Sequence, residues 1–439
     1  MAGSSSRVRT TLRALRHRNF QLFFAGQLIS LIGTWMQNVA QSWLVYRLTG
    51  SSALLGMVGF AGQIPVFLFS PIGGLIADRH SRHRIVIATQ TSAMILACIL
   101  AALTLTGRVQ VWHIFVLAAL LGVVNAFDIP ARQSFLVEMV GREDLINAIA
   151  LNSSMFNGAR IIGPAVAGIL VAAIGEGWCF FANGVSYIAV IIGLLLMTVT
   201  PPARVMKGSA VRHIIDGFRF AAHTGPIRAL LLLLGLVSAT GMPYAVLMPV
   251  FADQIFHSGA RGLGILMGFS GLGALLGALM LATRQGVHGL GRWVAVSCGV
   301  FGASLVLFSL SRSFWIAAAA LIPVGFAMMT QMGASNTLIQ SMTPDHLRGR
   351  VMSVYSMMFM GMAPVGALLA GVMAQRFGAP FTVAAGGVIA IAGAMLFGLR
   401  LPALRPEARQ LILAQQMVGG DPAEEVTAQG GAESTQAVN

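Results

Sequence analysis

The chain has 439 residues, of which 56% are hydrophobic and only 10% are charged. Soluble proteins average roughly a quarter charged residues, so this composition excludes a soluble domain and indicates a membrane protein. The net charge of +14 does not indicate nucleic-acid binding, because the basic residues are scattered in short segments between apolar runs and form no single patch.

Residues 1–19 form a basic N-terminal segment with five arginines and no acid. The apolar run that follows, residues 20–46, has no small-residue cleavage site and is longer than the core of a signal peptide. We therefore expect this run to remain in the protein as the first membrane helix.

Eleven further apolar runs follow, each close to the roughly 20 residues that a helix needs to cross a bilayer. The predicted all-α membrane protein therefore has twelve transmembrane helices. The later runs cover residues 53–77, 84–106, 111–137, 146–173, 178–199, 226–250, 262–283, 292–311, 314–340, 350–374 and 379–399.

A polar segment at residues 200–225 divides these runs into two groups of six and is predicted to be a cytoplasmic linker. Glu143-Asp144-Leu145 in the first group is echoed by Asp345-His346-Leu347 in the second. We expect two pseudo-symmetric six-helix halves, residues 20–199 and 226–401, around a central cavity. The tail, residues 402–439, is rich in Ala, Gly, Gln and Glu and is predicted to be disordered and cytoplasmic.

The distribution of basic residues predicts the orientation of the helices. With a cytoplasmic amino terminus, most of the 28 Lys and Arg residues fall in inside segments. Positive charge accumulates on the cytoplasmic side of membrane proteins, so both termini are expected there, in a multi-pass protein of the bacterial inner membrane. The outside loops would hold only Arg47, Arg108, Arg261, Arg312 and Arg376.

The first helix carries polar residues at spacings of three and four, which place them on one face. A polar stripe in an apolar span indicates contact with water, and we expect this face to line the cavity. Some of the candidates could instead form hydrogen bonds between helices. The cavity and substrate candidates are Gln27, Thr34, Asn38 and Gln41 on this helix, with Asn157, Arg160, Tyr244, Gln331 and Asn336 on later ones.

The link between the second and third runs reads GGLIADRHSRHR, residues 73–84. It resembles the signature of the major facilitator superfamily, in which a Gly is followed four residues later by an Asp and then by arginines. The resemblance implies that Gly74 allows close helix packing and that Asp78, Arg79 and Arg82 belong to a conformational switch. The alternative is that the arginines only mark the cytoplasmic side.

The end of the fourth run reads NAFDIPARQSF, residues 125–135, and resembles the branch that includes macrolide and enterobactin exporters. An acid within a membrane span is costly and is usually paired. We expect Asp128 to pair with Arg79 or Arg82, and we place Arg132 in the same switch. The alternative is an Asp at a helix end, solvated by cytoplasm.

The fifth run contains NGARIIGPAVAG, residues 157–168. It is similar to the antiporter motif of the same superfamily, which implies that Gly158, Gly163, Pro164 and Gly168 let this helix pack against the other half. Arg160 lies inside the span, where a cation costs at least about 2.5 kcal/mol unless it faces a cavity or a partner. We expect it to bind an anionic or polar substrate group; the alternative is a structural pair with Asp128 or with backbone carbonyls.

Taken with the resemblance, these features predict a secondary transporter that exports small amphipathic molecules, drug-like or siderophore-like, by alternating access. Protons are the expected coupling ion, since no nucleotide-binding motif is present. A lipid flippase or an importer on the same fold stays open, and a membrane-embedded enzyme is less favoured. Three separated cysteines and no ligand-spaced histidines give no metal site, cofactor or catalytic group. The chain is expected to act as a monomer in the lipid bilayer.

Overall fold

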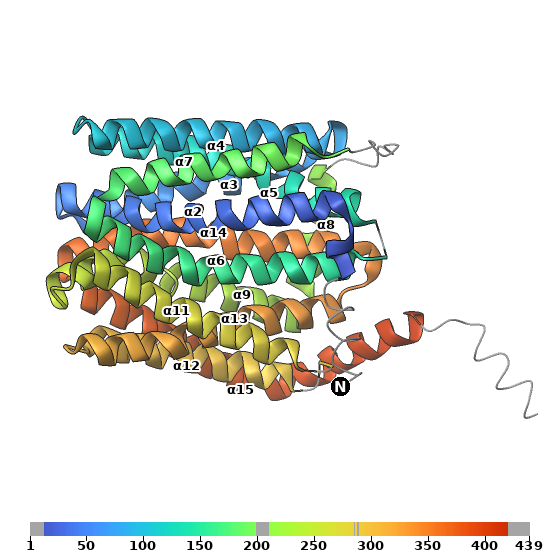
Figure 1. Ribbon diagram of the computed structural model, residues 1–439. Coiled ribbons are helices and arrows are strands. Elements are labelled where there is room, and N and C mark those ends of the chain that lie inside the picture. Colours follow the sequence, from blue (N-terminus) through green and yellow to red (C-terminus); the bar gives the residue numbers. More distant parts are fainter. Residues whose placement is uncertain (1–12, 142, 199–209, 285, 288, 420–439) are drawn as a thin grey trace, which may run out of the picture.

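The computed structural model describes residues 13–141, 143–198, 210–284, 286–287 and 289–419, and within them it contains helices and no strand. The helices run nearly parallel to one another as a bundle (Figure 1). The predicted all-helical class is therefore confirmed.

The first half of the bundle begins with a short 3₁₀ turn and continues with six long helices. Gly50 ends the first of these in a left-handed conformation (φ 61°) that glycine adopts without strain, and Ser51 caps the next by accepting a bond from the Leu54 N–H. The elements are η1 (Arg13–Arg16), α2 (Arg18–Thr49), α3 (Ser52–Arg79), α4 (Arg82–Leu105), α5 (Val111–Val140), α6 (Leu145–Ile174) and α7 (Glu176–Leu195).

The second half follows an amphipathic connecting helix, α8 (Ala210–His223). Its first span is broken after α9 (Gly225–Thr240), continues as α10 (Tyr244–Val250) and closes with a π-helical turn, η2 (Phe251–Ile255). Pro243, which cannot donate a helical hydrogen bond, lies at this break. The remaining helices are α11 (Gly259–Ala282), α12 (Leu290–Leu310), α13 (Phe314–Met342), α14 (Asp345–Phe377) and α15 (Ala379–Gly419).

Among the described residues, eleven helical segments are long and apolar enough to cross a membrane. The predicted first span, α2, is not one of them. Gln27, Gln37 and Asn38 lie within its apolar run and lower its mean hydropathy. It nevertheless runs along the bundle beside α6 and α7 (Figure 1), and its role as a twelfth span stays a prediction.

The tail differs from the expected disorder over residues 402–419, which extend α15 as a continuous helix. Apolar residues spaced three and four apart hold this extension against the second half: Leu401, Leu404, Ala408 and Leu411. The composition of the tail concealed this pattern. Residues 420–439 lie outside the described part, as do residues 1–12 of the basic segment and 200–209 of the linker.

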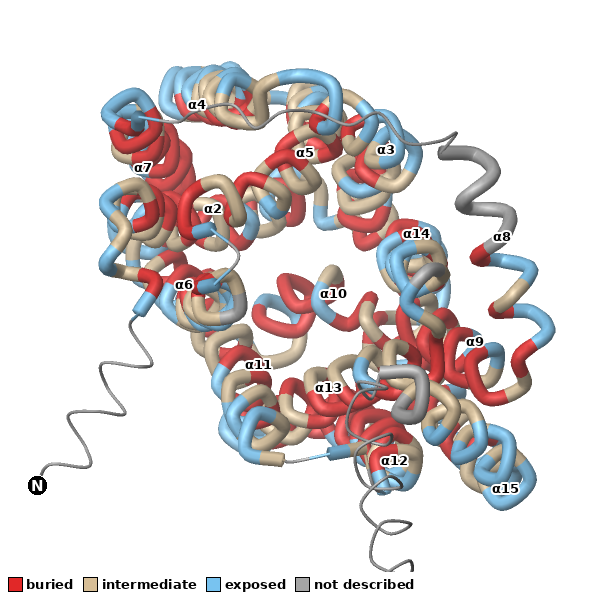
Figure 2. The backbone as a smooth tube through the Cα atoms, turned by 90° about the vertical axis from the view of Figure 1, so that its right-hand side faces the viewer, coloured by how far each residue is buried: buried red, intermediate tan, exposed pale blue. Residues whose placement is uncertain are grey.

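The described ends of the chain share one end of the bundle. η1, α8 and the far end of α15 all lie at the right-hand end in Figure 1. Figure 2 looks onto this end and shows α2 to α7 on one side and α9 to α15 on the other, with α10 lying deeper between them.

The two halves meet at the opposite end through glycine pairs. A Cβ added at Gly168 of α6 would lie 2.9 Å from the Cα of Gly264 of α11. A Cβ at Gly56 of α3 would lie 3.0 Å from the Cα of Gly371 of α14. Such small residues let helix backbones approach closely. The halves are thus tightly joined at the end remote from α8.

Candidate functional site

A cavity of about 270 Å³ lies between the two halves, directly inside these glycine contacts. Pro164 lines it and its carbonyl oxygen abuts Gly264, while Ala367 lines it and its carbonyl oxygen abuts Gly56. Residues from both halves form the wall, as a site with alternating access requires. They are Trp35, Gln63, Arg160, Pro164, Met242, Pro243, Tyr244, Ala245, Val246, Met248, Met267, Ser270, Gly271, Ala363 and Ala367.

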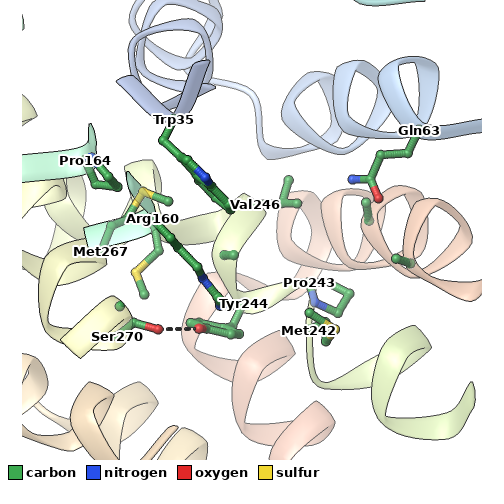
Figure 3. A pocket seen from close by; sticks show the side chains of 15 residues that line it. Trp35, Gln63, Arg160, Pro164, Met242, Pro243, Tyr244, Val246, Met267 and Ser270 are labelled. Carbon is green, nitrogen blue, oxygen red and sulfur yellow. Dashed lines mark hydrogen bonds between the residues drawn. The ribbon is translucent and has the colours of Figure 1, made fainter. Parts of the chain in front are cut away.

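Arg160 is the charged residue of this wall. Figure 3 shows its side chain extending from α6 toward Tyr244, with the Trp35 ring beside it. The centre of the guanidinium lies 5.9 Å from the centroid of the Trp35 ring, within the range of a cation–π interaction. The Tyr244 hydroxyl is itself 2.7 Å from the Ser270 hydroxyl. No acidic residue in the described part of the chain forms an ion pair with Arg160.

The remaining wall is mainly apolar, with Met242, Met248, Met267 and Val246 among its members. Methionine side chains adapt to ligands of different shape. A guanidinium in apolar surroundings forms strong charge-assisted hydrogen bonds to carboxylates and other oxyanions. The cavity therefore fits a ligand with an apolar body and an anionic or strongly polar group.

Of the nine cavity candidates, the structure brings Arg160 and Tyr244 to this cavity. Gln331 is instead fully buried, and Thr34 bonds to the Ser30 carbonyl and contacts the Tyr187 hydroxyl. Asn157 and Asn336 each bond within their own helix. None of these four residues lines the cavity, and neither do Gln27, Asn38 and Gln41.

Trp35, Gln63 and Ser270 line the cavity but were missed by the sequence analysis. Gln63 and Ser270 are polar residues inside apolar spans, so the signal that selected Gln27 was present for them too. Trp35 lies one position after Thr34, on a different face of α2, and its apolar character gave no signal.

Near the end of α3 the close helix approach is at Gly73, not at Gly74 as expected. A Cβ at Gly73 would collide with the Ala126 carbonyl oxygen of α5, whereas Gly74 faces open space. Arg82 bonds to Glu138 of α5 at 3.0 Å and contacts Asp78 at 3.4 Å. Glu138, which the switch prediction omitted, thus ties the start of α4 to α5.

Asp128 does not pair with Arg82 in this structure. Its buried carboxylate accepts bonds from Arg132 at 3.0 Å, Thr89 at 2.8 Å and Gln90 at 2.9 Å. A helical offset of four residues makes Arg132 the nearer cation, since residues four apart share a helix face. The reading of Asp128 as a solvated helix-end acid is excluded by its burial, and pairing of Arg160 with Asp128 is also not observed.

The glycines of the antiporter-like motif in α6, residues 157–168, have different packing partners. Gly168 packs against the other half through Gly264, as the motif implies. Gly163 instead packs within its own half, against Trp35 and Ile32 of α2, and Gly158 faces open space. The motif therefore supports both the contact between halves and the position of the Trp35 ring.

A cluster at the end of the bundle near α8 fixes η1 to the start of α6. The buried Asp144 carboxylate contacts Arg13 at 3.0 Å, Arg16 at 2.8 Å and His17 at 2.8 Å. The hydrogen bond from His17, with the positive charges of Arg16 and Arg13, holds the pKa of Asp144 below its usual range. The loop between α5 and α6 is thereby anchored to the amino-terminal segment.

This cluster predicts a pH-dependent contribution to stability. Because the pKa of Asp144 is lower in the folded chain than in the unfolded one, the contribution is full above the usual carboxyl range and is lost as the pH falls through the lowered pKa. The Tm of the wild type should exceed that of Asp144→Asn at neutral pH, and the difference should shrink in acid. Glu143→Gln, at an exposed neighbouring acid, should show no such trend. A Tm difference that stays constant from neutral to acidic pH would contradict the assignment.

Comparison with known proteins finds relatives that are named as siderophore transporters or drug efflux pumps. A family model described as a transmembrane secretion effector matches residues 9–432. The chain is 28% identical to the Staphyloferrin A transporter of Staphylococcus aureus, covering 85% of this chain and 94% of the relative. It is 25% identical to the multidrug efflux pump Tap of Mycolicibacterium fortuitum (79% and 87% covered) and 24% identical to the enterobactin exporter EntS of Escherichia coli (90% and 93%).

Solved structures share the fold at lower identity. The nucleoside transporter NupG superposes with a TM-score of 0.71 at 13% identity, covering 88% of this chain and 98% of that one. A bacterial homologue of the iron transporter ferroportin gives a TM-score of 0.64 at 15% identity, covering 87% and 98%. These likenesses show a common architecture.

Proposed function

Because the chain belongs to the transmembrane secretion effector family of the major facilitator superfamily, we propose that it exports small amphipathic molecules from the bacterial cytoplasm by alternating access, driven by proton antiport. It is a transporter and not the membrane-embedded enzyme that the sequence left open. In this proposal it works as a monomer in the inner membrane with both termini in the cytoplasm.

The observation that carries the proposal is Arg160 in a largely apolar cavity shared by the two halves. A cargo with an acidic or strongly polar group would meet the guanidinium, while its apolar part would meet Met242, Met248 and Met267. Siderophores with deprotonated catechol or carboxylate groups have this chemistry. The names of the siderophore transporter and exporter among the relatives agree with it.

A cavity that is closed at one end can take up cargo only from the other end. With α8 and both described chain ends facing the cytoplasm, the glycine contacts of Gly168 and Gly56 would close the external end. The cavity would then receive cargo from the cytoplasm. Alternating access would require these contacts to open and the opposite end to close.

Asp128 is the residue we propose for proton coupling, because it is a buried acid within a span and a member of a polar cluster joining α4 and α5. In acid-loaded inside-out vesicles, adding a catechol siderophore should raise the pH of the lumen as protons leave in exchange. Asp128→Asn should abolish this proton release. Removing one partner of a buried ion pair typically costs about 3–5 kcal/mol of stability, so the Tm is measured on the same preparation.

Two further variants distinguish loss of the Asp128 carboxylate from a general effect of removing charge. Asp345→Asn changes an exposed acid and should leave proton release unchanged. Asp128→Asn with Arg132→Gln removes both charges, so the fold is spared an unpaired cation while the carboxylate is still lost. Normal proton release by the folded double variant would rule out Asp128 as the coupling group. Siderophore uptake without any proton movement would instead indicate facilitated transport.

A further inference from the structure

The loop between α11 and α12 holds a second arginine that stacks on an aromatic ring. The Arg284 guanidinium lies over the Trp293 ring with its centre 4.9 Å from the ring centroid. Gly291 of this segment packs against Leu401 of α15, which places the loop at the end of the bundle where α8 and the end of α15 lie.

One nitrogen of this guanidinium has no partner. Arg284 Nη1 is buried and forms no hydrogen bond with any described residue. Leaving a buried donor of a charged group unsatisfied costs more than leaving a neutral one unsatisfied. The nitrogen can therefore take an acceptor, and an anionic one suits its charge, from outside the described part of the chain.

No acid in the described part of the second half supplies that anion. The sequence contains no Asp or Glu between Asp253 and Asp345. Asp345 pairs with Arg348, and Glu407 accepts a bond from the Gly225 N–H. The equivalent loop of the first half differs, because Arg82 has both Asp78 and Glu138 as partners.

The face of α12 beyond Trp293 is apolar and exposed. Val296, Val300 and Leu307 follow Trp293 at helical spacings of three, seven and fourteen residues and are 60%, 39% and 54% exposed. In a membrane such a surface contacts acyl chains. An oxyanion bound at Arg284 would thus lie at the head of a lipid-facing strip.

We propose that Arg284 and Trp293 form a binding site for the phosphate of an anionic phospholipid of the cytoplasmic leaflet. The phosphodiester oxygen accepts from Arg284, and one acyl chain lies along Val296 and Val300. Arg292, which is exposed and directly precedes Trp293 in the first turn of α12, adds a second positive charge. Among the described residues no acid lies between Asp253 and Asp345 to bind an ammonium headgroup, so the site favours phosphatidylglycerol over phosphatidylcholine.

The test is lipid binding to the full-length protein purified in detergent. Native mass spectrometry should show wild-type protein retaining phosphatidylglycerol several-fold more than phosphatidylcholine. In a parallel titration, phosphatidylglycerol should raise the Tm, and inorganic phosphate at the same concentration should not. Arg284→Gln should weaken phosphatidylglycerol binding by about tenfold or more, as expected for loss of a charge-assisted hydrogen bond. Arg312→Gln, at an exposed arginine between α12 and α13, should bind like the wild type.

Each result decides for or against the site. Equal retention of the two lipids by the wild type would overturn the proposal without reference to any variant. Equal binding by Arg284→Gln and the wild type would show that the lipid sits elsewhere. A Tm increase with inorganic phosphate alone would mean that the site takes free phosphate, which would overturn the lipid assignment.

Discussion

The variant Arg160→Gln is expected to bind an anionic amphipathic cargo about 10- to 100-fold more weakly than the wild type. Arg160 is the cation of the cavity wall, and loss of a hydrogen bond to a charged group removes roughly 1.5–3 kcal/mol. Glutamine retains a polar side chain but supplies neither the charge nor the paired donors of a guanidinium. The measurement is the Kd of purified protein for a catechol siderophore.

A matched pair of comparisons isolates the charge effect at Arg160. Arg108→Gln changes an exposed arginine outside the cavity and should leave the Kd unchanged. A macrolide that bears an amine should bind Arg160→Gln at least as well as the wild type, because a repulsive cation has been removed. If the siderophore Kd were the same in Arg160→Gln and the wild type, Arg160 would have no part in cargo recognition.

The second large effect is expected at the contact between the halves, in Gly168→Val. A Cβ at this position would lie 2.9 Å from the Gly264 Cα and 3.2 Å from the Ala260 carbonyl oxygen, so backbone would have to move. Overpacking of a tight interface typically costs about 1–3 kcal/mol, enough to shift a two-state equilibrium by roughly 5- to 150-fold. The end closed by these contacts, which we propose to be the external one, should therefore open more often, and cargo export should fall.

This shift can be read by labelling a cysteine placed in the cavity wall, Ala245→Cys, in a Cys98→Ser background. Cys179 and Cys298 are buried. A membrane-impermeant maleimide added outside the cell should label residue 245 several-fold faster with Gly168→Val than without it. Gly158→Val is the control on the same helix, since its Cβ would meet nothing within 4 Å. Unchanged labelling in folded Gly168→Val would contradict the assignment of this contact as the external closure.

The helices of the fold could be predicted from the sequence because a membrane span is encoded locally, by an apolar run of sufficient length. Local composition also explains why α2 is less apolar than most of the other long helices and why the helical end of α15 was not predicted. The polar residues of α2 lower its mean hydropathy, and the helical spacing of Leu404, Ala408 and Leu411 was hidden by the composition of the tail. Both segments are regular helices, although the mean hydropathy of α2 and the composition of the tail are atypical of membrane-associated helices.

A residue of the site could be predicted only where its type is unusual for its place in the sequence. Arg160 did so, because a cation within a span demands a cavity or a partner. Trp35 could not be found in this way, since its place over the guanidinium depends on how α2 packs against Gly163 of α6. Similarly, the choice between Gly73 and Gly74 depends on the rotation of α3 about its axis, which a short motif does not fix. Partner choice, as for Asp128, required the packing of α4 against α5.

Proton-driven export of anionic amphipathic cargo is tested most directly by uptake into inside-out vesicles, with and without an acidic lumen. The two substrates are a radiolabelled amphipathic carboxylic acid and its neutral methyl ester. We expect the acid to accumulate when the lumen is acidic, an uncoupler to abolish this accumulation, and the ester to accumulate far less. Equal accumulation of acid and ester, or none of either by protein shown to be folded, would contradict an exporter that recognises its cargo through Arg160.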